Sequence, residues 1–75
     1  MWKEGSIKVH GSIFRYWQKV YEDGSEWGID GGKVSKLMLK RDGMIVANYD
    51  RGWDIKPADP DTQLAVDILL HGENY

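Results

Sequence analysis

The run KVSKLMLKRDGMIVANYD at residues 33–50 decides the fold, because it holds two strand-like segments around the turn signal Asp42-Gly43. Apolar and polar side chains alternate on both sides of that signal. Such alternation is typical of an antiparallel pair with one buried face and one solvated face. Residues 33–41 and 44–50 are therefore predicted to form a β-hairpin.

Two registers fit this hairpin. A two-residue turn at Asp42-Gly43 would place Leu37 opposite Asn48 and so set a polar amide among leucines. A three-residue loop, with Gly43 in the left-handed conformation, places Leu37 opposite Ala47 instead. We predict the second register because it keeps one face apolar. Its core face holds Leu37, Leu39, Ile45, Ala47 and Tyr49, and its outward face holds Lys36, Met38, Lys40, Met44, Val46 and Asn48.

Two further strand-like runs precede the hairpin. Residues 6–9 and 12–22 are rich in β-branched and aromatic side chains, and His10-Gly11 between them is compatible with a tight turn. A glycine-rich stretch at residues 28–33 then leads into the hairpin. We expect a bulged bend there and not a phosphate-binding loop, because such a loop needs a helix N-terminus after its glycines, whereas here a strand follows.

A helix follows the strands. Asp59 is a predicted N-cap, and Pro60 suits the first helical position because its missing N–H would have no partner there anyway. Gly72 is predicted to end the helix in the left-handed C′ position. The apolar residues of this helix span a wide arc: Leu64, Ala65, Val66, Ile68, Leu69 and Leu70. Either the helix lies deep in a cupped sheet, or its surplus apolar edge meets a second subunit.

These elements predict one α+β domain over residues 1–75, a four-stranded antiparallel meander with one C-terminal helix packed across one face. We place the strands at about residues 5–54, a linker at 55–59 and the helix at about 60–71. A core of this size rarely supplies more than about 3–5 kcal/mol of stability.

The composition narrows the functional classes. The chain has no cysteine and a formal charge of -2, so disulfides and thiolate metal sites are excluded and no strong attraction to phosphate is implied. The two histidines and the carboxylates show no metal-ligand or catalytic spacing. We therefore expect no cofactor, no metal, no small-molecule substrate and no enzymatic activity. Because neither a signal-peptide run nor a stretch of about 20 apolar residues is visible, we expect a cytoplasmic protein outside the membrane.

One candidate for partner binding is an aromatic and basic cluster at residues 49–54. Arg51 stacked on Trp27 or Trp53 would form a binding hot spot. We call these three residues the rim. The alternative interpretation is that the rim only closes the core.

The other candidate is the outward face of the hairpin. Lys36 and Lys40 lie there beside Met38 and Val46, so this face could contact phosphate or a protein surface. Strand lysines outside a core also serve simply to solvate a sheet and to discourage edge aggregation.

The segments SEWGIDGGKVSKL at residues 25–37 and YDRGWD at 49–54 together resemble the pattern of a family of small uncharacterised proteins of Gram-positive gut bacteria, their phages and mobile elements. The family pattern more often has Tyr in place of Trp27 and Arg in place of Lys33. No activity comes with the family. The resemblance implies an intracellular protein carried by a mobile element, in a setting where small domains bind and modulate a host protein.

The function that these observations favour is a non-catalytic protein-interaction module, which binds through the outward sheet face and the rim or self-associates through its helix. The alternative is a nucleic-acid-binding accessory protein that lays the lysine-bearing face on a phosphate backbone. The residues predicted to bind the partner are Trp27, Lys36, Met38, Lys40, Val46, Arg51 and Trp53.

Overall fold

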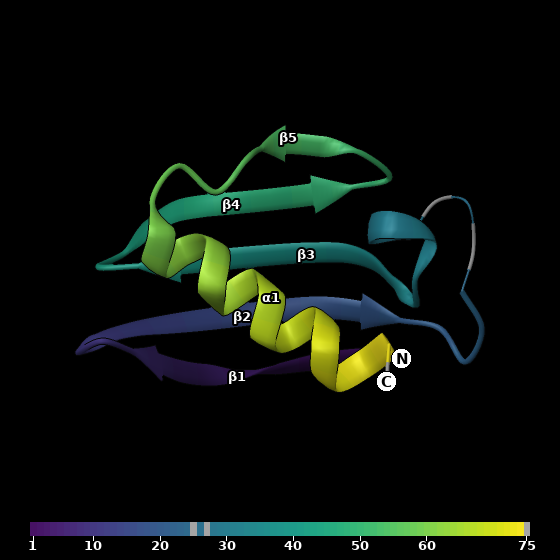
Figure 1. Ribbon diagram of the computed structural model, residues 1–75, viewed down its shortest axis with the longest axis horizontal. Coiled ribbons are helices and arrows are strands. Elements are labelled where there is room, and N and C mark those ends of the chain that lie inside the picture. The colour runs from purple at the N-terminus through teal and green to yellow at the C-terminus, as the bar shows by residue number, and fades with distance from the viewer. Residues whose placement is uncertain (25, 27, 75) are drawn as a thin grey trace.

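The computed structural model describes the chain except for residues 25, 27 and 75 (Figure 1). Within the described residues, one antiparallel sheet contains five strands in chain order: β1 (Trp2–Val9), β2 (Ser12–Val20), β3 (Val34–Arg41), β4 (Met44–Asp50) and β5 (Trp53–Ile55). A short 3-10 turn, η1 (Ile29–Gly31), lies in the connection between β2 and β3. The helix α1 (Pro60–Asn74) crosses one face of the sheet, as predicted.

The prediction of four strands was wrong, because residues 53–55 add a fifth. The chain reverses after β4 at Arg51, which has a positive φ of 61°, and then pairs Trp53 with Tyr49 and Ile55 with Asn48. Three residues are too few to show an alternating pattern, so the sequence carried no strand signal there.

The helix is longer than the sequence predicted. Gly72 does not end α1, which continues to Asn74. Glycine takes ordinary helical dihedrals at a cost of about 1 kcal/mol relative to Ala, so it permits a helix end without imposing one.

Both tight hairpins use two-residue turns in which each residue has a positive φ. The values are 49° and 87° at His10 and Gly11, and 53° and 77° at Asp42 and Gly43. This is the pattern of type I′ turns, whose twist matches that of the flanking strands. The prediction of a left-handed Gly43 is confirmed, whereas the predicted three-residue loop is wrong, because the turn has two residues.

The register of β3 and β4 follows neither of the two alternatives, because a β-bulge intervenes. Lys40 pairs with Ile45, but Leu39 pairs with Ala47, so Val46 is the extra residue. Ile45 consequently lies beside Lys40 and is 44% exposed, although it was expected in the core. Val46 was expected to point outward, and it instead packs against the core in part.

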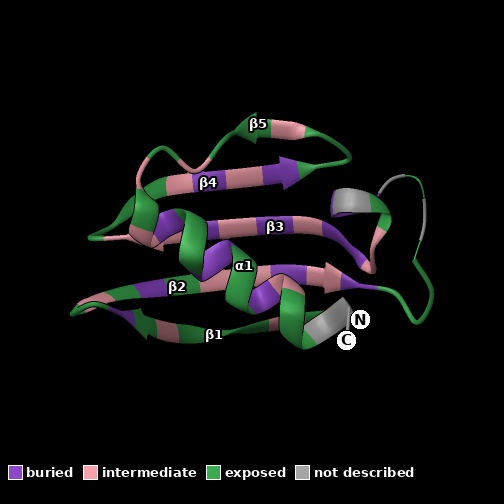
Figure 2. Ribbon diagram, in the orientation of Figure 1, coloured by how far each residue is buried: buried purple, intermediate pink, exposed green. Residues whose placement is uncertain are grey.

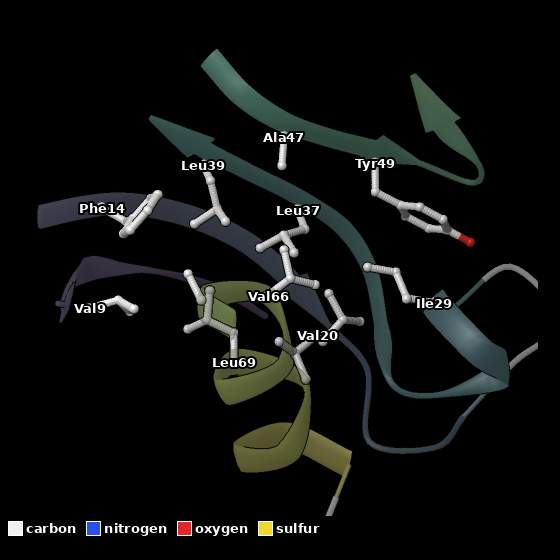
Figure 3. Packing of buried hydrophobic residues seen from close by; sticks show 12 residues of the cluster. Val9, Phe14, Val20, Ile29, Leu37, Leu39, Ala47, Tyr49, Val66 and Leu69 are labelled. Carbon is white, nitrogen blue, oxygen red and sulfur yellow. The ribbon is translucent and has the colours of Figure 1, made fainter. Parts of the chain in front are cut away.

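The core lies between the sheet and α1 (Figures 2 and 3). Leu37 and Leu39 are buried at its centre, as predicted, together with Ala47 and Tyr49. The remaining members of the cluster are Val9, Phe14, Val20, Ile29, Val34, Ala65, Val66 and Leu69. The wide apolar arc of α1 is only partly buried in this core, because Leu64 and Ile68 are 39% and 46% exposed.

The glycine-rich connection forms the turn η1 where a bulged bend was expected. A Cβ on Gly28 would lie 1.9 Å from the carbonyl oxygen of Gly32, so only glycine fits at that position. This close approach lets the chain close tightly around η1, and Ile29 of η1 is buried near Tyr49 (Figure 3). Gly28 and Gly32 thus allow the backbone around η1 to pack closely.

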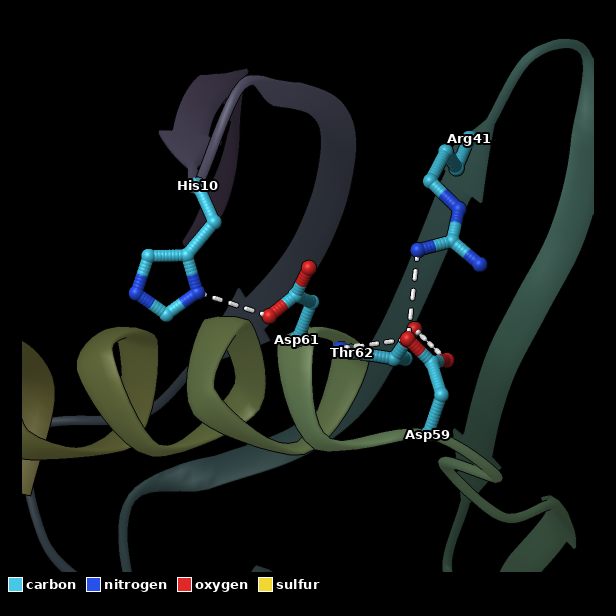
Figure 4. A network of polar contacts seen from close by, with 5 residues as sticks. All are labelled: His10, Arg41, Asp59, Asp61 and Thr62. Carbon is cyan, nitrogen blue, oxygen red and sulfur yellow. Dashed lines mark hydrogen bonds and ion pairs between the residues drawn. The ribbon is translucent and has the colours of Figure 1, made fainter.

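A polar network attaches the start of α1 to the sheet (Figure 4). Asp59 is the N-cap that the sequence predicted: its Oδ2 accepts from the Thr62 backbone N–H at 3.3 Å, and its carboxylate also accepts from the Thr62 hydroxyl. The Arg41 guanidinium on β3 donates to Asp59 at 3.1 Å. Beside this cap, Nδ1 of His10 lies 2.8 Å from Oδ1 of Asp61. Both hairpin turns at this end are thereby linked to the helix.

Candidate functional site

The candidate site is the sheet face opposite α1, which no other element of the described chain covers; we call it the outer face. Its side chains form three rows across the strands. The central row is Glu4, Trp17, Met38, Asn48 and Ile55. The two flanking rows are Trp2, Lys19, Lys36 and Asp50 on one side, and Ser6, Arg15, Lys40 and Ile45 on the other.

Two pairs of cations face each other across β2 and β3. Lys19 lies directly opposite Lys36, and Arg15 lies directly opposite Lys40. Like charges in directly opposite positions destabilise an antiparallel pair. The two pairs occupy the two flanking rows, so the four cations surround Trp17 in the central row.

Aromatic rings hold several of these cations in place. The Arg15 guanidinium carbon and the Lys40 ammonium each lie 5.6 Å from the centre of a Trp17 ring. The Lys19 ammonium lies 5.9 Å from a Trp2 ring and 5.4 Å from the ring of Tyr21. These are cation–π distances, worth about 0.5–1 kcal/mol each at exposed sites.

Charge at this face also affects a phenol. The hydrogen bond from Lys19, followed by its positive charge, lowers the pKa of Tyr21 from its ordinary value of 10.0. Lys36 forms an ion pair with Asp50, but this pair is loose, because Nζ and Oδ1 are 3.8 Å apart and both side chains are exposed. The face is therefore electropositive along β2 and β3.

Two depressions lie on either side of Trp17. The first, of about 200 Å³, is bordered by both Trp2 and Trp17, with Lys36, Met38, Asn48 and Asp50 around it. The second, of about 470 Å³, is bordered by Ile13, Arg15, Trp17, Lys40, Asp42 and Gly43. Each depression thus combines an indole ring with at least one cation.

Three of the residues predicted from sequence lie together on this outer face. They are alternate residues of β3, and each lies in a different one of the three rows: Lys36, Met38 and Lys40. Val46 does not join them, because the bulge turns it toward the core. The basic part of the predicted site is thus a continuous surface.

Of the described rim residues, Trp53 is not part of the same surface. Trp53 packs edge-on against Tyr49, with ring centres 5.1 Å apart and planes at 75°, and belongs to the border of the core. Arg51 is exposed in the bend between β4 and β5. Trp27 lies outside the described residues. Trp53 therefore fits the interpretation in which the rim closes the core.

Sequence reasoning missed the residues of the first two strands, namely Trp2, Arg15, Trp17 and Lys19. The signal was present in β2, where Arg15, Trp17 and Lys19 alternate with the buried Phe14 and Gln18. Alternation assigns these three residues to one face. It does not say that this face adjoins Lys36 and Lys40.

The fold and the site define a small α+β protein with one helix-covered sheet face and one open face rich in cations and indole rings. The chain belongs to a family described as a domain of unknown function, DUF7678, which matches residues 1–74. This confirms the expectation of an uncharacterised small-protein family. Neither the curated proteins nor the solved structures give a significant match.

Two further features bear on function, namely groups of metal-ligating side chains and helices that could span a membrane. Among the described residues, no three His, Asp or Glu side chains group in a way that could hold a metal ion. No helix in the described part of the chain has the length and apolar character needed to cross a membrane.

Proposed function

We propose that this protein is a non-catalytic binding module whose outer face holds a nucleic-acid strand. The observation that carries the proposal is the cross-strand register, which sets Lys19 opposite Lys36 and Arg15 opposite Lys40. Each like-charge pairing is unfavourable in the free protein and becomes favourable when an anionic group lies between the two cations. A polyanion with regularly spaced phosphates is a ligand that would satisfy both pairs together.

The negative net charge does not oppose this proposal, because the charges are segregated. The three rows of the outer face carry the cations Arg15, Lys19, Lys36 and Lys40 and the carboxylates Glu4 and Asp50. Lys8 lies beyond these rows opposite Ile13, and the carboxylates of Asp42 and Asp54 lie at the border, so the cations are concentrated on β2 and β3. Carboxylates such as those of Asp59, Asp61 and Asp67 belong to the helix side of the molecule. The local field of a surface, more than the total charge, steers a charged ligand.

The test is the affinity for labelled oligonucleotides, measured by fluorescence anisotropy at low and at moderate salt. If the four cations each contact one phosphate, affinity for a single strand falls roughly 50-fold between about 50 mM and 200 mM salt. The double variant with Lys19→Gln and Lys40→Gln should bind more weakly and should show about half the salt dependence, because two of the four cations remain.

The matched control is Lys56→Gln, which removes a lysine that borders a groove beside α1 instead of the outer face. This control should bind like the wild type. Absence of binding at low salt, or an equal loss in the control, would rule out the outer face as a nucleic-acid site.

A protein partner is the second candidate, and a separate observation favours it. Ile13, Ile45 and Ile55 are exposed at the border of the outer face, and exposed apolar side chains of this kind mark protein interfaces.

Self-association through the exposed Leu64 and Ile68 of α1 is a second route to a protein partner. Light scattering after size exclusion tests it, because a strict monomer at high concentration removes the dimer. A mobile-element origin and modulation of a host protein stay predictions of the sequence resemblance.

A further inference from the structure

We infer that the outer face binds a single strand in preference to a duplex, and that one nucleobase enters the depression between Trp2 and Trp17. This inference rests on the proposed function and names its ligand class. Trp2 pairs with Lys19 and Trp17 pairs with Glu4, so the two tryptophans are diagonal neighbours on adjacent strands. Diagonal neighbours lie about 7–8 Å apart, which is within reach of aromatic side chains.

The dimensions of this depression suit a flat ring. A base stacked between two rings needs ring planes about twice the 3.4 Å stacking repeat apart, and aromatic side chains whose backbones are about 7–8 Å apart can reach that separation. The space is about 200 Å³ and has the apolar side chain of Met38 beside it. Every base has an aromatic face, so stacking between two indoles requires no particular sequence.

The charges around the depression separate the base from its phosphates. Asn48 and Asp50 border it from β4, and the Asp50 carboxylate repels a phosphate but accepts hydrogen bonds from the N–H groups of a base edge. Asn48 is already oriented, because its Nδ2 donates to Asp54 at 3.3 Å. Lys36 also borders the depression, but its ammonium lies 3.8 Å from the Asp50 carboxylate, so the depression favours a base over a phosphate.

The cation pairs lie on either side of the base site and suit the phosphates. Lys19 and Arg15 are four residues apart on β2, which corresponds to about 13 Å along an extended strand. Their partners Lys36 and Lys40 on β3 repeat this spacing. A nucleic-acid strand that runs along β2 and β3 thus meets one cation pair at one end of the base site and the other pair beyond Trp17.

A duplex would not make this arrangement. Its bases are paired and stacked within the helix, so insertion of one base requires extrusion at a cost of a few kcal/mol. The side chains around the depression also include Asp50, whose carboxylate would face a phosphate if the base stayed in the duplex. Single strands present unstacked bases without that cost.

The experiment compares a labelled oligothymidine strand with a hairpin duplex of equal charge, at one low salt concentration. The variants Trp2→Leu and Trp17→Leu keep an apolar side chain but remove the stacking surface, and each should weaken single-strand binding roughly 5- to 140-fold. Trp17→Phe should retain part of the affinity. Met44→Leu, at the exposed start of β4, is the control and should bind like the wild type. Circular dichroism of each variant shows whether the sheet has folded.

The outcomes separate the inference from the proposed function. If the duplex binds as well as the single strand and the tryptophan variants bind normally, the base site is wrong but the nucleic-acid interface stands. If neither nucleic acid binds, both are wrong. If polyglutamate binds more tightly than oligothymidine, the ligand is an acidic protein segment and the inference is overturned.

Discussion

At the scale of single residues, Asp59 connects the helix to the sheet. Its carboxylate accepts hydrogen bonds from the hydroxyl and the backbone N–H of Thr62 and from Arg41 on β3 (Figure 4). The hydroxyl of Thr62 is the largest cause that lowers the pKa of this carboxyl below its ordinary value of 3.8, and Arg41 acts in the same direction. The charged form is therefore stabilised in the folded state.

This shift predicts a pH-dependent stability. Because the folded pKa of Asp59 lies below the unfolded one, its contribution is fully present above the unfolded pKa and is lost as the pH falls through the folded pKa. Asp59→Asn should lower the Tm by a few degrees at neutral pH, and the difference from the wild type should shrink in acid below pH of about 4. Thermal unfolding followed by circular dichroism measures it.

The control for this prediction is Asp67→Asn. Asp67 accepts a hydrogen bond from Gln63 on the exposed side of α1 and has no contact with the cap. Its Tm should follow that of the wild type at both pH values. A constant Tm difference for Asp59→Asn across the acid range would contradict a role for the charge.

At the scale of elements, the hairpin of β3 and β4 shows why a register is hard to read from sequence. Alternation identified Leu37, Leu39, Ala47 and Tyr49 as core residues, and the structure confirms all four. It could not place the bulge, because a type I′ turn at Asp42-Gly43 and an extra residue, Val46, together mimic a longer loop. The residue lost from the predicted core was therefore the one nearest the turn.

The bulge makes a testable difference between two neighbours. Ile45→Ala should cost less than about 1 kcal/mol, because Ile45 is exposed on the outer face. Leu39→Ala should cost roughly 2–5 kcal/mol, because Leu39 is fully buried under α1. Urea unfolding measures both. Equal losses for the two variants would contradict the bulged register.

Only the β3 part of the candidate site could be predicted from the sequence, because the connection between β2 and β3 is long. Lys36, Met38 and Lys40 follow from alternation within one strand. Their neighbours Arg15 and Trp17 depend on the register of β2 against β3, which are joined by the long connection at residues 21–33. A short turn fixes register, but a connection of this length does not.

At the scale of the whole molecule, the two faces of the sheet have opposite roles. The inner face and α1 bury the core, and the ionic contacts there, such as Arg41 with Asp59, are between opposite charges. The outer face also holds the loose Lys36–Asp50 pair, but between β2 and β3 it sets like charges opposite each other. A surface that lowers the stability of the free protein in this way is expected where a ligand binds.

This opposition predicts that one substitution raises stability and removes binding. Lys40→Glu places a carboxylate opposite Arg15, which replaces a repulsive cross-strand pair with an attractive one. Lys40→Gln loses the same cation–π contact with Trp17, so relative to that variant the free energy of unfolding of Lys40→Glu should be higher by roughly 0.2–1 kcal/mol, and oligonucleotide affinity should fall sharply. Urea unfolding at low salt and fluorescence anisotropy measure the two effects on the same preparation.

Salt distinguishes this cause from a change in packing. Screening weakens interactions between exposed charges, so added salt should stabilise the wild type and should bring Lys40→Glu closer to it. Lys56→Glu, which lies away from the outer face, should change neither the stability at low salt nor the affinity. If Lys40→Glu is no more stable than Lys40→Gln at low salt, the like-charge pair is not a source of strain in the free molecule. An anion site between Arg15 and Lys40 would then lose its main support.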